Sequence, residues 1–404
     1  MKLTYFAIVI ALSTQLYAGG SLSFEDHVYE EMSLQQIVGL GMAVVDENQI
    51  LYSNTFGLED KERGVIADRS DTLFRLGTMT HMVTATLALK AYEEGLISLD
   101  KNIQEYWRGY KLPKKYYRIS LEREKETGEL IEFHRLVPLN TGHSISMAQL
   151  LTHTSGLKGH PLDEDDYTPG LANLPFFNRG MKWGIRKWLK APLTSLPGTK
   201  AHVTKIGYNL AGIILEKATN ARYMDLVKKW INIPTGITSF TPDTYWKRYK
   251  NQRRSVWYTL NKKSQIIEAK DRDLSWALAS EGLLGTINDM AKFCKAQLQS
   301  RYVSKALRNK YQWSPQRLND DTPNMNSFGQ ILNLAESGVD PDIYAGSDMT
   351  GAKNILKIDP NKKRCYIIMS NTQHHKVRTT KLLELLERAT PINGKNKLKF
   401  VPNI

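Results

Sequence analysis

A hydroxyl and an imidazole stand three residues apart in the segment FRLGTMTHMVTATLALK, residues 74–90. They belong to Thr78 and His81. Residues at i and i+3 share one face of a helix, so this imidazole could take a proton from the hydroxyl as it attacks a carbonyl carbon. The ordinary pKa of histidine, about 6.5, leaves the ring mostly neutral near pH 7. The added methyl group of threonine, however, restricts χ1 and crowds the attack path.

Apolar periodicity predicts the elements that must position this pair. A buried helix is expected from Met79 to Glu94, before Gly95. The run VGLGMAVVDENQILYSNTFG, from Val38, predicts a central hairpin, and a second, exposed hairpin is expected within 108–142. Further helices are expected at Met147–His153, Trp183–Leu189, Ile206–Ala218, Tyr223–Ile231 and Asn288–Leu298.

The last third of the chain reads as sheet followed by a helix. Strand-like runs begin at Phe328, Ala352 and Arg364, and an amphipathic helix is expected at Thr379–Arg388. Strands at both ends with helices between them predict an α/β (α+β) fold, an antiparallel sheet built from both termini with an inserted helical lobe. We place the sheet lobe at about 19–75 and 280–404, and the helical lobe at about 76–279 with the 108–142 hairpin inserted.

Four separated motifs occur in one order. They are FRLGTMTH, LLTHTSGL at 150–157, PGTKAHVTKIGYNLAGIILEKAT from Pro197, and EGLLGTINDMAKF from Glu281. Together they resemble the serine β-lactamase family, in particular class C β-lactamases and penicillin-binding-protein-like serine hydrolases. The resemblance implies a β-lactamase/transpeptidase-like fold and covers roughly residues 35–390. It also implies that His153, in LLTHTSGL, belongs to a structural signature.

The chain departs from the family at each catalytic position. The Ser-x-x-Lys of the family is replaced by Thr78 and His81, and the Tyr-x-Asn by Val203, Thr204 and Lys205. The His-x-Gly of the inner strand is best matched by Tyr344-Ala345-Gly346. The resemblance therefore marks Thr78 and His81 as degenerate nucleophile and base positions.

The same alignment predicts a ligand-binding pocket. Lys205 would supply positive charge beside His81, and backbone N–H groups at residue 78 and near Gly346–Gly351 would hold a carbonyl or carboxylate. Val203, Thr204, Tyr344 and Gly346 would line this pocket. Asp348 could instead pair with Lys205 and cancel the charge.

The N-terminus predicts export. MKLTYFAIVIALSTQLYAGG has a lysine, an apolar run and small residues, which indicates a signal peptide cleaved near Ala18. No later stretch reaches membrane-spanning length, so a secreted or periplasmic protein is expected. For the two cysteines, Cys294 and Cys365, two separate buried thiols are the favoured interpretation and a disulfide is the alternative.

The formal net charge of +14 admits several anionic partners. The basic segments Arg179–Lys190 and Tyr245–Arg254 could bind an anionic envelope polymer, although a solvated face is the favoured interpretation. Export argues against nucleic acid. Neither metal-binding spacing nor a cofactor motif is found, so we expect no metal and no cofactor.

Three functions remain open from the sequence. The leading hypothesis is a secreted, catalytically degenerate relative of serine hydrolases that binds a cell-envelope ligand, such as a peptide or muropeptide carboxylate. The second is an active amide or ester hydrolase using Thr78 with His81 or Lys205. The third is a protein- or polyanion-interaction module built on the 108–142 hairpin and the basic segments.

Overall fold

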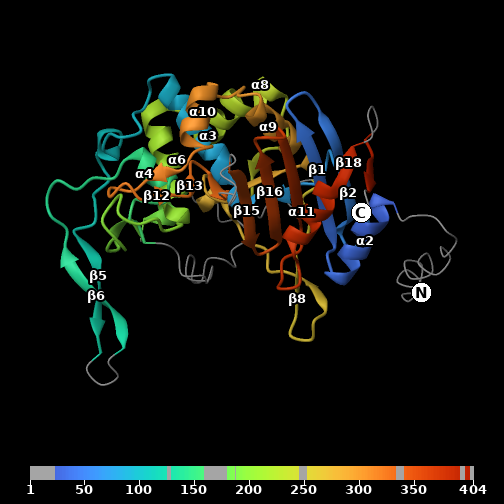
Figure 1. The fold of residues 1–404 in the computed structure, drawn as a ribbon, viewed down its shortest axis with the longest axis horizontal. Helices are drawn as coiled ribbons and strands as arrows, with labels where there is room; N and C mark the ends of the chain where they lie inside the picture. Colours follow the sequence, from blue (N-terminus) through green and yellow to red (C-terminus); the bar gives the residue numbers. More distant parts are fainter. Residues whose placement is uncertain are drawn as a thin grey trace.

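One antiparallel sheet joins the two ends of the chain. The computed structural model describes residues 23–124, 129–158, 180–186, 188–244, 253–333, 341–391 and 396–400. The expected signal peptide lies outside these residues. The sheet has eight strands in the order β13-β14-β15-β16-β17-β1-β2-β3 (Figure 1). Their bounds are β1 Gly39–Asp46, β2 Ile50–Asp60, β3 Val65–Ile66, β13 Asn326–Ser327, β14 Gln330–Asn333, β15 Asp342–Met349, β16 Ala352–Asp359 and β17 Arg364–Ser370.

Helices cover the sheet. Their bounds are α2 Phe24–Leu34, α3 Thr80–Glu93, α4 Met147–Leu151, α5 Met181–Ile185, α6 Lys205–Thr219, α7 Tyr223–Val227, α8 Ile233–Thr235, α9 Ile287–Leu298, α10 Lys305–Tyr311 and α11 Thr379–Arg388. Short 3₁₀ turns are η1 Gly77–Met79, η2 Ile103–Glu105, η4 Trp188–Lys190 and η7 Ser275–Ala277, and η5 Lys228–Asn232 is a π turn. The predicted helices are present, whereas α2, α8 and α10 were not predicted.

Strand β1 is buried and without polar side chains up to its last residue, Asp46, because both faces of the sheet are covered. Leu40, Met42 and Val44 pack in one cluster with side chains of α2 and α11. Ala43 and Val45 point the other way, into the large cluster formed with α3, α6 and α9. Successive side chains of a strand point to opposite faces, so β1 serves two cores. The predicted sheet from both termini is confirmed by the pairing of β1 with both β2 and β17.

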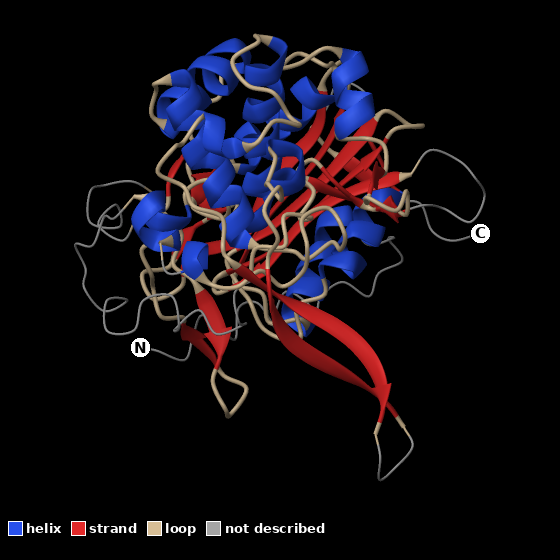
Figure 2. Ribbon diagram, turned by 90° about the vertical axis from the view of Figure 1, so that its left-hand side faces the viewer, coloured by secondary structure: helices blue, strands red, loops and turns tan. Residues whose placement is uncertain are grey.

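Smaller strands complete the fold. They are β4 Phe74–Arg75, β5 Lys115–Arg123, β6 Leu130–Pro138, β7 Thr241–Pro242, β8 Tyr258–Leu260, β9 Ile266–Glu268, β10 Leu283–Gly285, β11 Gln316–Arg317, β12 Pro323–Asn324, β18 Ala389–Pro391 and β19 Leu398–Phe400. The β5–β6 ribbon projects far from the body, and Figure 2 shows it in profile. It is the exposed hairpin predicted within 108–142.

The two cysteines correct the sequence interpretation of separate thiols. Cys294 of α9 and Cys365 of β17 form a disulfide with a Cα–Cα distance of 6.4 Å. Both side chains lie on the face of the sheet that packs against α3, α6 and α9, in the large helical core. Sequence separation gave no sign of this contact, because α9 packs on β17 only in the folded chain.

Within the described residues, no helix has the length and apolar character needed to span a membrane.

Candidate functional site

The candidate site lies where η1 meets β15. Gly77 opens η1 with a φ of +55°, and a side chain there would collide with that of Ser347 on β15. Glycine adopts this left-handed conformation without steric cost. The close approach places the next residue, Thr78, directly against the strand.

The hydroxyl of Thr78 is directed at the strand rather than at a base. Its Oγ1 donates a hydrogen bond to the backbone carbonyl of Gly346. Gly346 is exposed on β15, and β14 pairs with β15 only from Asp342 to Tyr344. Among the described residues, the strand edge beside Thr78 is therefore not covered by β14.

His81 lies one helical turn further along, beneath the site. Its side chain is 6% exposed, and its ring stacks on that of Tyr208 with centroids 3.7 Å apart and planes 11° apart. Burial lowers the pKa of His81 well below its ordinary value, and His153 and Lys205 lower it further. The ring is therefore neutral at pH 7, but it is a weak proton acceptor.

Tyr208 is in turn held by the backbone. Its hydroxyl donates to the carbonyl of Leu151 at 2.7 Å and accepts the N–H of Gly329 at 2.7 Å. These bonds hold the phenol ring beneath His81. The Nε2 atom of His81 is buried and makes no hydrogen bond within the described part of the chain.

His153 lies just after α4, at the position for which the family resemblance predicts a structural role. It follows α4 with a φ of +59°, and its Nδ1 accepts the backbone N–H of Thr204 at 3.2 Å. Burial lowers the pKa of His153 to about 4. The neutral ring thus joins the end of α4 to the loop before α6.

The three residues at the Tyr-x-Asn position behave differently from one another. Val203 is 60% exposed and offers no acid or base. Thr204 is the N-cap of α6, where its hydroxyl accepts the N–H of Ile206 at 3.1 Å. Lys205 forms an ion pair of 2.7 Å with Glu281, whose side chain is 4% exposed.

The inner-strand residues Tyr344, Gly346 and Asp348 share the face of β15 that is turned away from the helical core. Tyr344 packs with the cluster under α11, and its hydroxyl lies 3.4 Å from Asp342. Asp348 pairs with Lys353 at 3.1 Å and accepts a hydrogen bond from Gln373. The structure therefore brings Thr78, His81, Lys205 and Gly346 together, but it does not bring Tyr344 to them, and the partner of Asp348 is not Lys205.

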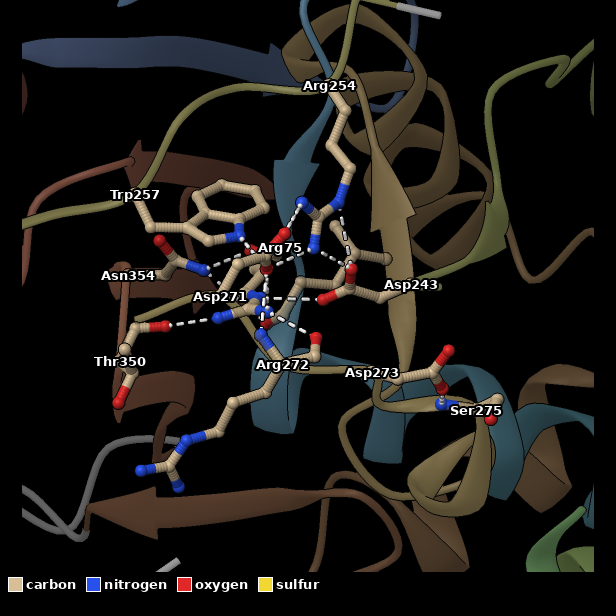
Figure 3. A network of polar contacts seen from close by, with 11 residues as sticks. Arg75, Asp243, Arg254, Trp257, Asp271, Arg272, Asp273, Ser275, Thr350 and Asn354 are labelled. Carbon is tan, nitrogen blue, oxygen red and sulfur yellow. Dashed lines mark hydrogen bonds and ion pairs between the residues drawn. The ribbon is translucent and has the colours of Figure 1, made fainter. Parts of the chain in front are cut away.

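A buried network that was not anticipated from the sequence fixes β4 immediately before this site. Arg75 is 1% exposed and bonds Asp243 at 2.6 Å and the carbonyl of Thr350 at 2.7 Å (Figure 3). Arg254 bonds the same Asp243 and also Asp271. Both guanidinium groups lie over the indole ring of Trp257, at 4.6 and 4.8 Å from its centroid.

This network also corrects one expectation about the basic segments. Arg254 ends the segment Tyr245–Arg254, for which a solvated face was favoured, yet its side chain is 1% exposed. Residues 245–252 lie outside the described part. The only sequence signal was the pairing of arginines with a tryptophan three residues later.

Comparisons with known proteins find relatives that match more than half of this chain. The chain is 28% identical over 261 residues to ML-236A carboxylate methylbutanoyltransferase mlcH of Penicillium citrinum, covering 61% of this chain and 58% of that protein. It is 22% identical over 289 residues to the D-alanyl-D-alanine-carboxypeptidase/endopeptidase AmpH of Escherichia coli K12, covering 70% of this chain and 62% of that protein. The matches thus span less than two thirds of either relative.

The fold is shared with solved structures. The octameric penicillin-binding protein homologue from Pyrococcus abyssi superposes with a TM-score of 0.70 at 19% identity, covering 90% of this chain and 76% of that one. The family model described as Beta-lactamase matches residues 24–389. This chain therefore belongs to the β-lactamase family.

Proposed function

We propose that this protein is a catalytically degenerate member of its family that binds a peptide-like ligand of the cell envelope without hydrolysing it. The observation that carries the proposal is the direction of the Thr78 hydroxyl, which donates to the carbonyl of Gly346. The side chain at the base position, His81, is stacked on Tyr208 and has a lowered pKa. Loss of a nucleophile or its base in a serine hydrolase costs about 10⁶ in turnover.

Binding could outlast catalysis because it uses backbone groups. Thr78 lies in the first turn of a helix, where backbone N–H groups have no intrahelical acceptor. The edge of β15 beyond Tyr344 is the kind of edge to which an extended peptide adds as a strand. A ligand that uses both would be a peptide or a muropeptide.

Relatives favour this chemical class. AmpH is named as a D-alanyl-D-alanine carboxypeptidase, and a β-lactamase/D-alanine carboxypeptidase from Yersinia pestis was solved with citrate. In this chain a terminal carboxylate would have to compete with Glu281 for Lys205. We therefore expect a carboxylate to add little affinity.

Export is part of the proposal. The apolar leader before Ala18 is the sequence argument. The disulfide between Cys294 and Cys365 is the structural one, since such bonds persist in oxidising compartments.

The deciding experiment separates acylation from binding. The wild type and Thr78→Val are exposed to a fluorescent penicillin and to an activated ester, and intact masses are recorded. We expect no adduct on either protein. An adduct on the wild type that is absent from Thr78→Val would establish Thr78 as a nucleophile and reject the proposal in favour of an active hydrolase.

Binding is measured in parallel by titration calorimetry with a muropeptide. Thr78→Val keeps the shape of the side chain and should keep the affinity. Thr78→Trp fills the space beside Gly346 and should abolish binding. Absence of binding to the wild type, or equal binding by Thr78→Trp, would show that this site does not hold the ligand.

A further inference from the structure

The projecting β5–β6 ribbon exposes apolar side chains that nothing in the described protein covers. The exposed fractions are 65% for Leu121, 60% for Leu130, 46% for Leu136 and 37% for Phe133. The ribbon stands clear of the body in Figures 1 and 2. A two-stranded ribbon is marginally stable alone, and a long exposed edge is a template for pairing with another chain.

Among the described residues, no further strand pairs with the outer edge of β6. At the two ends of the ladder, Glu124 N–H donates to the Glu129 carbonyl and Leu139 N–H to the Lys114 carbonyl. Bonded and non-bonded pairs alternate along an antiparallel ladder.

The residues of β6 that turn their backbone groups away from β5 are therefore Leu130, Glu132, His134 and Leu136. Within the described residues these two strands form a sheet of their own. The opposite edge, on β5, is partly used, because Tyr117 N–H donates to the carbonyl of Leu193.

We propose that β6 pairs antiparallel with β6 of a second copy of this chain, about a twofold axis at Phe133. The two ribbons then form one four-stranded sheet. In this register Leu130 lies opposite Leu136 of the second copy, and Glu132 lies opposite His134 of the second copy. The symmetry repeats both contacts, so each carboxylate faces an imidazole and each leucine faces a leucine.

Charge and side-chain direction select this register. Glu132 and His134 already lie on one face of β6, with Oε2 and Nε2 3.4 Å apart. An axis at His134 would place Glu132 opposite Leu136, and an axis at Glu132 would place two carboxylates together. Of these three axes, only the one at Phe133 places a carboxylate opposite an imidazole and a leucine opposite a leucine. The proposed dimer does not depend on which ligand the Thr78 site binds.

Exchange of the two polar residues tests the register. His134→Glu places two carboxylates opposite each other, and sedimentation equilibrium should show loss of the dimer. Glu132→Lys/His134→Glu should restore it, since the introduced ammonium group then faces the introduced carboxylate of the second copy. The matched control is Lys263→Glu, which adds negative charge to the loop of the β8–β9 hairpin and should leave the dimer intact.

Crosslinking provides a second measurement. In the proposed register, Phe133 and its equivalent in the second copy form a non-hydrogen-bonded pair. The Cα atoms of such a pair lie about 4.5 Å apart, which is within reach of a disulfide. Phe133→Cys should therefore give a dimer band on a non-reducing gel, and the two native cysteines are already bonded to each other.

Ile131→Cys lies on the same face but would be displaced from its own copy by about 13 Å along the strand, so it should stay monomeric. A monomeric wild type at every concentration, failure of the double exchange to restore the dimer, or equal crosslinking of both cysteine variants would overturn the proposal.

Discussion

At the scale of the residue, Thr78 in η1 and His81 in α3 lie one helical turn apart, and we propose that they do not form a reactive pair. The hydroxyl donates to Gly346, and the imidazole rests against Tyr208 in a water-poor environment. A base must be able to hold a proton in order to activate a nucleophile. Burial lowers the pKa of His81 and therefore disfavours its protonated form.

We predict that Thr78→Ser alone will not restore hydrolysis. Serine removes the crowding methyl group but leaves His81 and Val203 at the base and phenol positions, and residues that act as a unit are strongly non-additive. Hydrolysis of nitrocefin and of a nitrophenyl ester should remain at the level of Thr78→Ala. The comparison variant is Thr78→Ser/His81→Lys/Val203→Tyr. Substantial turnover by the single variant would contradict the prediction.

His153 predicts a pH dependence of stability. Its folded pKa is about 4 because the ring is buried, whereas the unfolded chain binds a proton below about 6.5. Between these values the unfolded state carries more protons, so the free energy of unfolding falls as pH drops from about 6.5 to 4. The contribution of this group is roughly 3 kcal/mol.

The matched variants are His153→Asn and His375→Asn. Asparagine tolerates the positive φ of position 153, and its carbonyl oxygen can accept the Thr204 N–H. Urea unfolding across pH 4–7 should show a smaller loss of stability for His153→Asn. His375 is exposed, so its replacement should leave the profile unchanged.

At the scale of the element, the position of η1 depends on contacts on both sides of it. Strand β4 precedes η1 and is fixed by the Arg75 network, and β15 lies against Gly77. The site is therefore built on packed elements rather than on mobile loops, which is what a preorganised binding site requires.

Arg75→Met should destabilise the fold by about 3–5 kcal/mol, because it leaves the two buried carboxylates of Asp243 and Asp271 with the single guanidinium of Arg254. Chemical denaturation measures the loss. The control is Arg222→Met, whose side chain is 85% exposed and pairs at the surface with Asp225. Its effect should be much smaller than that of Arg75→Met. Equal effects of the two substitutions would contradict the prediction that the buried network stabilises the fold more than a surface ion pair does.

At the scale of the whole molecule, the disulfide links the helical core to the sheet. Cys294 and Cys365 are 71 residues apart in the chain. A crosslink restricts the unfolded state, and its removal costs about 2–4 kcal/mol. Cys294→Ala/Cys365→Ala should lower the urea midpoint accordingly, and reductant should shift the wild type but not the variant. A wild type unaffected by reductant would contradict this expectation.

Export should remove the leader. The mass of the protein recovered from a secreting host should correspond to a chain that begins just after Ala18. Substituting Ala18→Arg blocks the small-residue cleavage site and should leave the longer chain. Full-length wild-type protein retained in the cytosol would be inconsistent with export.

Local patterns in the sequence were sufficient to predict the architecture. The apolar run of β1, the small-residue helix after Thr78 and the amphipathic pattern of α11 are local signals, and four family motifs in order assigned the topology. The sequence also located Thr78, His81 and Lys205 in one site, because each is carried by a motif of fixed geometry.

The surroundings of these residues are set by contacts that exist only in the folded chain. Tyr208 beneath His81, Glu281 beside Lys205, and Cys365 beside Cys294 are each contacts between residues remote in the chain. No periodicity encodes such contacts. Successive side chains of a strand point to opposite faces of the sheet, so a shift of one residue in the alignment would move Tyr344 to the other face. The burial of Arg254 likewise depends on two aspartates that only folding brings together.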